Sequence, residues 1–270
     1  MLQDFQNYLR SVRGYSENTI KAYSADLRSY ATWANANIPG SRWSTTTREH
    51  IDAYLNHCYE QGLKPTTTNR TLASISALYR FFQRQGLNVQ NPCKYESRRK
   101  LPTTIPTTID VKELARAYKH AHGLTKIMLG ILCTTGIRLQ ELLDLTYEDI
   151  DFNNNTLHIM GKGSKERIVK TDALALETLK GLHDEYNASG RIFYCSQRKA
   201  RYMIYDALQP YCKAKQLSPH AIRHTFATEL AKHGESNSTI SKILGHAHLE
   251  TSIKYINLAE IPDARCNIIN

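Results

Sequence analysis

Apolar side chains recur at helical spacing through most of the first 92 residues, and this periodicity restricts the start of the chain to a helical bundle. Three clusters of turn residues interrupt the pattern, at 37–41, 61–62 and 86. Four helices are therefore expected, the second of them capped by Ser16. Three of the helices carry these apolar stripes: Ile20, Tyr23, Leu27, Tyr30 and Ala34; Ile51, Tyr54, Leu55 and Cys58; and Leu72, Ile75, Leu78, Tyr79 and Phe82.

The charge of the chain is uneven along its length. The whole sequence has a formal net charge of +10, with 35 lysines and arginines against 25 acidic residues. Residues 1–100 hold 14 basic residues against 7 acidic ones, whereas residues 101–270 hold 21 against 18. A basic excess concentrated in one part of a chain suits a polyanionic partner such as DNA. A basic surface that only faces solvent is the alternative.

A basic segment rich in proline and threonine follows the predicted bundle. Asn91-Pro92 ends the bundle. Within residues 93–108 that follow, the first eight positions include four basic residues, which are Lys94, Arg98, Arg99 and Lys100. Like charges at this density repel one another unless a polyanion relieves them. The segment is therefore expected to be an interdomain linker that lies along nucleic acid. A solvated hinge without DNA contacts is the alternative.

Residues 109–270 are expected to form a second, mainly helical domain with a small β-sheet. Asp110 can cap a helix, and Gly136 ends an apolar segment that reads as a buried helix. Thr156–Met160 and Glu166–Lys170 then alternate in polarity on either side of G-K-G-S-K, which indicates a β-hairpin. A further short strand is expected at Arg191–Cys195.

Two pairs of polar residues share a three-residue spacing that puts each pair on one face of a helix. In S-P-H-A-I-R-H-T-F-A-T the pair is His220 and Arg223, with Pro219 suited to the first helical turn. In T-T-G-I-R-L-Q-E-L the pair is Arg138 and Glu141. Arg138 alone could be an ordinary surface arginine paired with Glu141, and Glu141 is expected to orient Arg138 rather than to act as a base.

The stretch after these motifs adds further groups that can act on a phosphate. His246 follows Leu-Gly, and Tyr255 ends T-S-I-K-Y nine residues later. Arginines neutralise phosphate oxygens, imidazole moves a proton and a phenol can attack phosphorus, so the set suits phosphoryl transfer by a tyrosine nucleophile. His224 is expected to be a core histidine. The run 191–215 holds six basic residues and one acid, and we expect Arg198, Lys199 and Arg201 to contact DNA.

The motifs T-G-I-R-x-x-E-L, G-K-G-S-K-E-R, H-A-I-R-H-T-F-A-T and L-G-H, with the tyrosine after them, resemble those of the tyrosine recombinase (phage integrase) family, of the Xer type. The opening, F-Q-N-Y-L-R-S-V-R-G-Y-S-E-N-T-I-K-A-Y, is similar to that family's DNA-clamping domain. The resemblance covers nearly the whole chain. It implies these catalytic residues: Arg138, Lys162, His220, Arg223, His246 and Tyr255. Lys162 would be the general acid, and Lys165 a backbone contact.

The resemblance implies a fold of an N-terminal four-helix, SAM-like core-binding domain (1–92), a linker (93–108) and a catalytic domain with a C-terminal tail (109–270), closed as a C around DNA. It further implies a 3′-phosphotyrosyl intermediate, a Holliday junction, and no requirement for ATP or metal. The partners would be double-stranded DNA with inverted half-sites and three more copies of the chain at synapsis, with the tail exchanged between protomers. Integration, excision, inversion and dimer resolution all remain open as roles.

Three other functions fit part of the pattern. A type IB topoisomerase uses a similar residue set to relax DNA, a metal-dependent nuclease could use the histidines, and a DNA-binding regulator could carry an idle site. Against the nuclease, the motifs lack the carboxylates that metal sites of this kind usually supply.

Six cysteines without C-x-x-C spacing favour reduced, mostly buried thiols, and no apolar run of membrane-spanning length occurs. A cytoplasmic, nucleoid-associated protein is expected.

Overall fold

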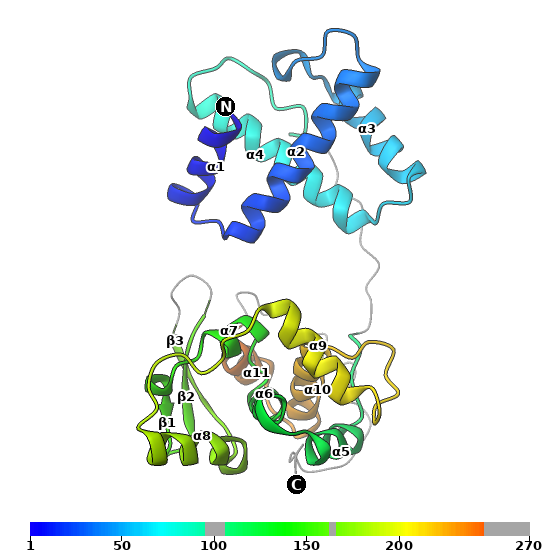
Figure 1. Cartoon of the computed structure of the whole chain (residues 1–270). Helices are drawn as coiled ribbons and strands as arrows, with labels where there is room; N and C mark the ends of the chain where they lie inside the picture. Colours follow the sequence, from blue (N-terminus) through cyan, green and yellow to red (C-terminus); the bar gives the residue numbers. More distant parts are fainter. Residues whose placement is uncertain (95–105, 162–165, 246–270) are drawn as a thin grey trace. The chain divides into compact units, whose positions relative to one another are not determined.

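The computed structural model describes residues 1–94, 106–161 and 166–245 (Figure 1). The chain divides into two compact units, residues 1–103 and 104–270. Each is mainly helical, and the second contains a small sheet. Among the described residues, none of the helices is long and apolar enough to cross a membrane.

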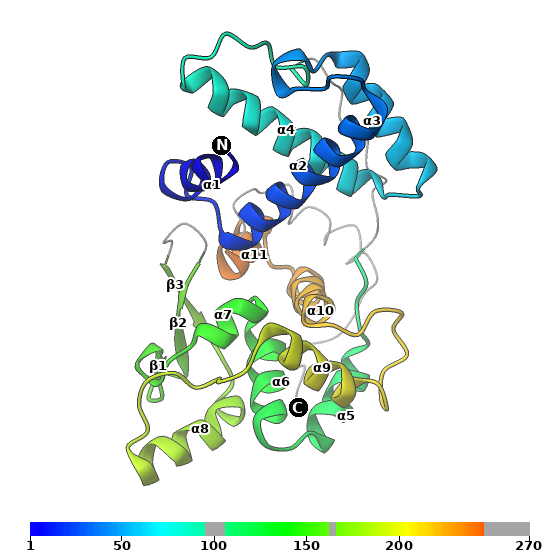
Figure 2. The same cartoon turned by 45° about the horizontal axis from the view of Figure 1, so that its top comes forward.

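The N-terminal unit contains the four expected helices. They are α1 (Leu2–Ser11), α2 (Glu17–Asn37), α3 (Arg48–Glu60) and α4 (Pro65–Arg84), with a short 3-10 turn η1 (Trp43–Thr45) before α3. Ser16 caps α2 as predicted, because its side chain accepts a hydrogen bond from the backbone N–H of Thr19 at 3.4 Å. The long helices α2 and α4 pack on each other, and α1 lies against both (Figure 2).

The core of the N-terminal unit is rich in aromatic rings. The ring of Tyr30 packs against the rings of Trp43 and Tyr54 at centroid distances of 5.3 and 5.2 Å. The predicted apolar stripes face this core, except that Tyr23 and Leu55 are only half-buried. One buried ion pair lies beside these apolar groups. Asp26 on α2 is 6% exposed and accepts two hydrogen bonds from Arg70 on α4, at 2.8 and 2.9 Å.

The C-terminal unit is built around one buried helix, α6. Its helices are α5 (Val111–His120), α6 (Gly123–Thr135), α7 (Leu139–Asp144), α8 (Ala173–Tyr186), α9 (Gln197–Leu208), α10 (Pro219–Lys232) and α11 (Asn237–Leu244). Helix α6 packs against α5, α7, α8, α9, α10 and the sheet (Figure 1). Its sequence is apolar on nearly every face, which is what a helix surrounded by others requires.

The predicted hairpin forms part of a three-stranded antiparallel sheet with the order β1-β2-β3. Its strands are β1 (Ile150–Asp151), which follows the 3-10 turn η2 (Tyr147–Asp149), β2 (Thr156–Met160) and β3 (Glu166–Lys170). In the β2–β3 register Leu157 pairs with Val169 and Ile159 pairs with Arg167. Leu157, Ile159 and Val169 are buried, so this face of the sheet packs on the helices.

The strand expected at Arg191–Cys195 is wrong. Arg191 forms only an isolated bridge with Thr146, and the adjacent backbone bonds join Ile192 to Leu145 and Tyr147 to Gly190. Ser196 then caps α9, so the segment turns into a helix before a longer ladder can form. The apolar residues that suggested a strand include Phe193, which is buried in the core without strand pairing.

The cysteines of the described residues are free thiols, as expected. Four of them (Cys58, Cys93, Cys133 and Cys212) are buried, and Cys195 is half-buried. Burial raises the pKa of the Cys133 thiol to about 12, with a small further rise from Cys212. A thiol with that pKa is protonated and inert at neutral pH.

Candidate active site

The turn between α6 and α7 positions the first arginine of the site. Gly136 ends α6 in the left-handed conformation at φ = 61°, and a Cβ atom there would lie 2.4 Å from the ring of Phe226. Both the backbone conformation and the lack of space require glycine at this position. The turn makes Arg138 the N-cap residue of α7.

Arg138 is held by three hydrogen bonds. Its backbone N–H and its Nη1 each donate to a carboxylate oxygen of Glu141 at 2.8 Å, and its Nη2 donates to the carbonyl of Gly245 at 2.9 Å. The side chain of Arg138 is still 39% exposed, so part of the guanidinium faces solvent. The expectation that Glu141 orients Arg138 agrees with these contacts.

Helix α10 supplies the second arginine. Ser218 caps this helix by accepting a hydrogen bond from the N–H of Ala221, and Pro219 occupies its first position. Arg223 is 3% exposed, and its Nη1 and Nη2 donate to the carbonyls of Gly136 and Leu244, each at 2.7 Å. These bonds fix the guanidinium between the end of α6 and the end of α11.

His220 lies one turn before Arg223, and its ring contacts that of a second histidine. The centroids of the His220 and His224 rings are 4.2 Å apart, in an edge-to-face arrangement. His224 is therefore half-buried beside the site, and its assignment as a core histidine is wrong. A residue four positions after His220 shares its helix face, which the spacing could have shown. His220 is exposed as a whole, but the surrounding protein partly desolvates its ring and lowers its pKa, and the charges of Arg223 and Arg138 lower it further.

The two arginines and His220 line one pocket of about 320 Å³, whereas His224 does not line it. Arg138, His220 and Arg223 are brought together there, and Arg201 from α9 also lines the pocket. The remaining lining residues are Ile137, Leu139, Gln140, Gln197, Ser218 and Pro219. The side chains of Gln140 and Gln197 are hydrogen-bonded to each other, and Arg201 donates to Gln197 at 3.0 Å. Two arginines and a largely neutral imidazole around one hollow suit a phosphodiester group.

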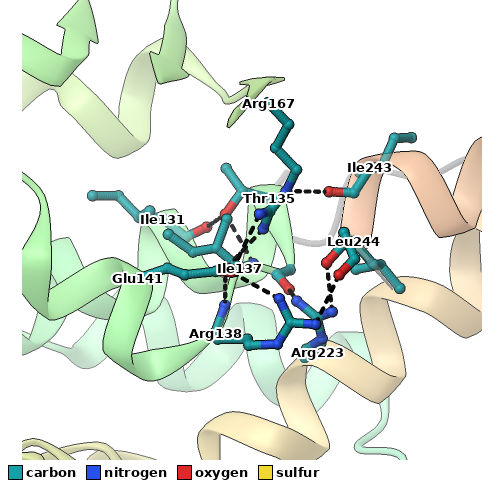
Figure 3. Close-up of polar contacts among 11 residues, drawn as sticks. Ile131, Thr135, Ile137, Arg138, Glu141, Arg167, Arg223, Ile243 and Leu244 are labelled. Carbon is teal, nitrogen blue, oxygen red and sulfur yellow. Dashed lines mark hydrogen bonds and ion pairs between the residues drawn. The ribbon is translucent and has the colours of Figure 1, made fainter. Parts of the chain in front are cut away.

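A third arginine completes the polar cluster, and the sequence reading missed it. Arg167 on β3 donates to both carboxylate oxygens of Glu141 at 3.2 and 2.7 Å and, through Nε, to the carbonyl of Ile243 at 2.9 Å (Figure 3). A signal was present in the sequence. Side chains of β3 alternate between the two faces of the sheet, and Arg167 is on the same inward face as Val169, two residues later. An unpaired charge on that face is costly.

The three arginines converge on the last turn of α11 (Figure 3). Arg167 binds the carbonyl of Ile243, Arg223 that of Leu244, and Arg138 that of Gly245. Gly245 has φ = 64°, and a Cβ there would lie 2.9 Å from Nη1 of Arg167. Glycine is thus required where the L-G-H motif leaves the helix, and cations compensate the helix's free carbonyls.

The remaining predicted site residues fall into two groups. Arg198 and Lys199 are exposed on α9 within the described structure. The following lie outside the described residues: Lys162, Lys165, His246, Tyr255, Arg98, Arg99 and Lys100. Within residues 1–94, 106–161 and 166–245, no group of three or more histidine, cysteine or acidic residues is placed to hold a metal ion.

Two family models match this sequence. The model described as the phage integrase family matches residues 107–260, which is more than half of the chain. The model described as the phage integrase N-terminal SAM-like domain matches residues 2–86. All of the described residues that line the pocket fall within the first match.

Relatives and solved structures agree with these matches. Tyrosine recombinase XerC of Staphylococcus aureus (strain USA300 / TCH1516) is 29% identical over 280 residues, covering 96% of this chain and 92% of the relative. The XerH recombinase bound to palindromic difH substrate has a TM-score of 0.74 at 18% identity, covering 96% of this chain and 82% of that one. A lambda integrase dimer bound to a COC′ core site has a TM-score of 0.70 at 16% identity, covering 99% and 79%. The two structures show a shared fold.

Proposed function

This chain belongs to the phage integrase family, and from that premise we propose that it recombines DNA at specific sites by breaking and rejoining its strands. The observation that supports this most is the convergence of Arg138, His220 and Arg223 on one pocket. They come from α7 and α10, which are separated by about 80 residues of sequence. The matched relatives are named as recombinases, so DNA relaxation by a single copy is the less favoured activity.

In the proposed reaction the phenol oxygen of Tyr255 attacks the phosphorus of the scissile phosphodiester. A bond forms between this oxygen and phosphorus, and the bond from phosphorus to the 5′-oxygen breaks. The products are a 3′-phosphotyrosyl link and a free 5′-hydroxyl. The energy of the phosphodiester is kept in the link, so the 5′-hydroxyl of another strand can reverse the step and rejoin the DNA.

The described residues supply charge and proton transfer to this step. Arg138 and Arg223 neutralise the non-bridging oxygens, whose charge grows in the transition state. His220 accepts the phenol proton, and its lowered pKa keeps it in the proton-accepting form at neutral pH. Lys162 gives a proton to the leaving 5′-oxygen, and His246 hydrogen-bonds the phosphate. Both last assignments rest on the family motif.

We extend the proposal to the DNA and the assembly. The two units would close as a C around duplex DNA, with the basic linker residues Arg98, Arg99 and Lys100 on the phosphates. Lys165, Arg198, Lys199 and Arg201 would add contacts from the C-terminal unit. Two protomers would bind inverted half-sites, four would form the synapse, and a Holliday junction would link the two strand exchanges. The apolar tail, residues 257–270, would dock on a neighbouring protomer.

The test begins with the target site. Genomic fragments captured by the purified protein give its sequence, which is then placed twice on one plasmid. The wild-type chain should recombine the two sites, whereas Tyr255→Phe should bind the site with nearly unchanged affinity and give no recombinant, because only the attacking hydroxyl is lost. Recombination by Tyr255→Phe would show that another residue is the nucleophile. Absence of recombination by the wild-type chain, together with strand nicking that EDTA abolishes, would favour the nuclease.

A further inference from the structure

Glu141 is a buried carboxylate shared by two arginines. Its side chain is 7% exposed and accepts four N–H groups: the backbone N–H and Nη1 of Arg138, and Nη1 and Nη2 of Arg167. The distances run from 2.7 to 3.2 Å. Arg167 thus holds Glu141 with a two-pronged fork, while Arg138 uses one guanidinium nitrogen and its backbone.

The two arginines differ in what else they face. Arg138 is 39% exposed and lines the pocket, whereas Arg167 is 11% exposed and does not line it. If Arg138 were the only cation beside Glu141, the pair would be nearly neutral, and its attraction for a phosphate would be small. With Arg167 present, Arg138, Glu141 and Arg167 together carry a net charge of +1. Of these three side chains, Arg138 is the one that lines the pocket.

We propose that Arg167 is the counter-ion of Glu141, a positioning residue that lets Glu141 orient Arg138 without cancelling the positive charge that Arg138 presents to the scissile phosphate. The inference rests on the proposed function, since it concerns the same phosphate. Arg167 acts through Glu141 and does not itself reach the pocket.

A second contact of Arg167 supports this role. Its Nε donates to the carbonyl of Ile243, one residue before the carbonyl bound by Arg223 and two before the one bound by Arg138. The last turn of α11 is therefore fixed to β3, α7 and α10 at once. In the sequence, Arg167 comes five residues after Lys162, and His246 follows Gly245 directly. Arg167 thus joins the strand that follows the proposed general acid to the two arginines of the pocket.

The experiment is a two-by-two set of variants at Arg167 and Glu141. Arg167→Gln removes the charge and keeps a donor for Ile243, Glu141→Gln removes the carboxylate charge, and the double variant removes both. The measurement is the single-turnover rate of covalent complex formation on a nicked target site, at saturating DNA, with DNA affinity determined separately. Lys170→Gln is the matched control, because it makes the same change at an exposed position of the same strand.

The counter-ion role predicts that the effect of Glu141→Gln changes sign. In the wild-type background it should slow cleavage, because Arg138 loses its orienting partner. In the Arg167→Gln background it should speed cleavage by about tenfold, since the uncompensated carboxylate is removed. Arg167→Gln alone should slow cleavage by about 10- to 100-fold, the scale of a misplaced catalytic group, with DNA affinity changed by less than about threefold. Lys170→Gln should cleave like the wild type.

Other results would contradict the inference. If Glu141→Gln slows cleavage by the same factor in both backgrounds, Arg167 does not compensate Glu141 and has only a structural role. If Arg167→Gln cleaves like Lys170→Gln, Arg167 has no role in the reaction, although the proposed function stands. If the wild-type chain forms no covalent complex, the proposed function fails and takes this inference with it. Should Arg167→Gln not fold, Arg167→Met replaces it as the variant that removes the charge, and Glu141→Gln must again speed cleavage in that background.

Discussion

The two units of this chain each bury one carboxylate against arginine, and they use the pair differently. In the described part of the N-terminal unit Asp26 is paired with Arg70, which donates to both of its carboxylate oxygens and joins α2 to α4. In the C-terminal unit Glu141 has two partners, and one of them, Arg138, still lines a pocket. One cation per carboxylate gives a neutral cross-link between helices. A second cation leaves a net positive charge that can act on a ligand.

The surroundings of the two carboxylates also distinguish a structural pair from a cluster that can act on a ligand. Asp26 lies beside a core of packed aromatic rings, and its arginine is 44% exposed. Glu141 lies where the carbonyls of Ile243 and Leu244 in α11, of the C-cap Gly245 and of Gly136 also accept hydrogen bonds from arginines. The N-terminal pair stabilises a fold, whereas the C-terminal cluster positions cations at the cost of holding several charges close together.

The largest expected effect distinguishes the two roles proposed for cations in the reaction: Arg138 stabilises charge, and Lys162 donates a proton. Arg138→Gln should lower the rate of cleavage by about 10³-fold, as expected for a lost group that stabilises transition-state charge. Lys162→Ala should be similarly slow on ordinary DNA. A 5′-bridging phosphorothioate has a thiolate leaving group that needs little protonation, so it should rescue Lys162→Ala far better than Arg138→Gln. Equal rescue of both variants would remove the general-acid role from Lys162.

The next effect tests whether the N-terminal pair is only structural. Asp26→Asn should lower the free energy of unfolding of the N-terminal unit by about 1–3 kcal/mol, because Arg70 loses its carboxylate partner and the buried side chain at position 26 keeps only neutral hydrogen bonds. The cleavage rate at saturating DNA should stay the same for the folded fraction. Thermal unfolding and single-turnover cleavage measure the two quantities. Asp52→Asn is the control, since the Asp52 side chain is 49% exposed and its Oδ2 lies 3.8 Å from Nε of Arg48 in the same unit. A slower cleavage step in folded Asp26→Asn would contradict the comparison.

The smallest expected effect is a change in the pKa of His220, which measures how much positive charge the C-terminal cluster directs into the pocket. Burial lowers the pKa of His220 below its ordinary value of 6.5, and the positive charges of Arg223 and Arg138 lower it further. His220 should therefore stay neutral as the pH falls through 6.5 and become protonated only below it. In Arg138→Gln, one of those charges is lost, and the pKa should rise toward 6.5. A titration of the His220 ring protons by NMR in the DNA-free protein measures both values. An unchanged pKa in Arg138→Gln would mean that little of the Arg138 charge reaches the pocket.

Local sequence was sufficient for most of the fold. The helical stripes of the N-terminal unit, the caps at Ser16 and Asp110, and the left-handed end of α6 at Gly136 depend on neighbouring residues alone. The hairpin was predicted from the change of period at residues 156–170. The strand at 191–195 failed because an apolar run cannot show whether a pairing partner lies beside it.

The site was predicted less completely, because its contacts join distant segments. Before the structure, Arg138, His220 and Arg223 could be grouped by the chemistry of their side chains and by their family motifs, but not by the distances between them. Arg167 and Asp26 each have a partner far away in the sequence, on another element. A buried charge is recognisable in a sequence when the polarity pattern puts it on an inward face, as at Arg167. The identity of its partner is a property of the tertiary fold.

The central claim is that the pocket built by Arg138, His220 and Arg223 serves a tyrosine nucleophile at position 255. The most direct measurement traps the wild-type protein on a nicked target site, digests the complex, and identifies the peptide and the DNA end that are joined. We expect a link from the Tyr255 oxygen to a 3′-phosphate, which is absent from Tyr255→Phe and strongly reduced in Arg223→Gln. A link through another residue, or to a 5′-phosphate, would contradict it.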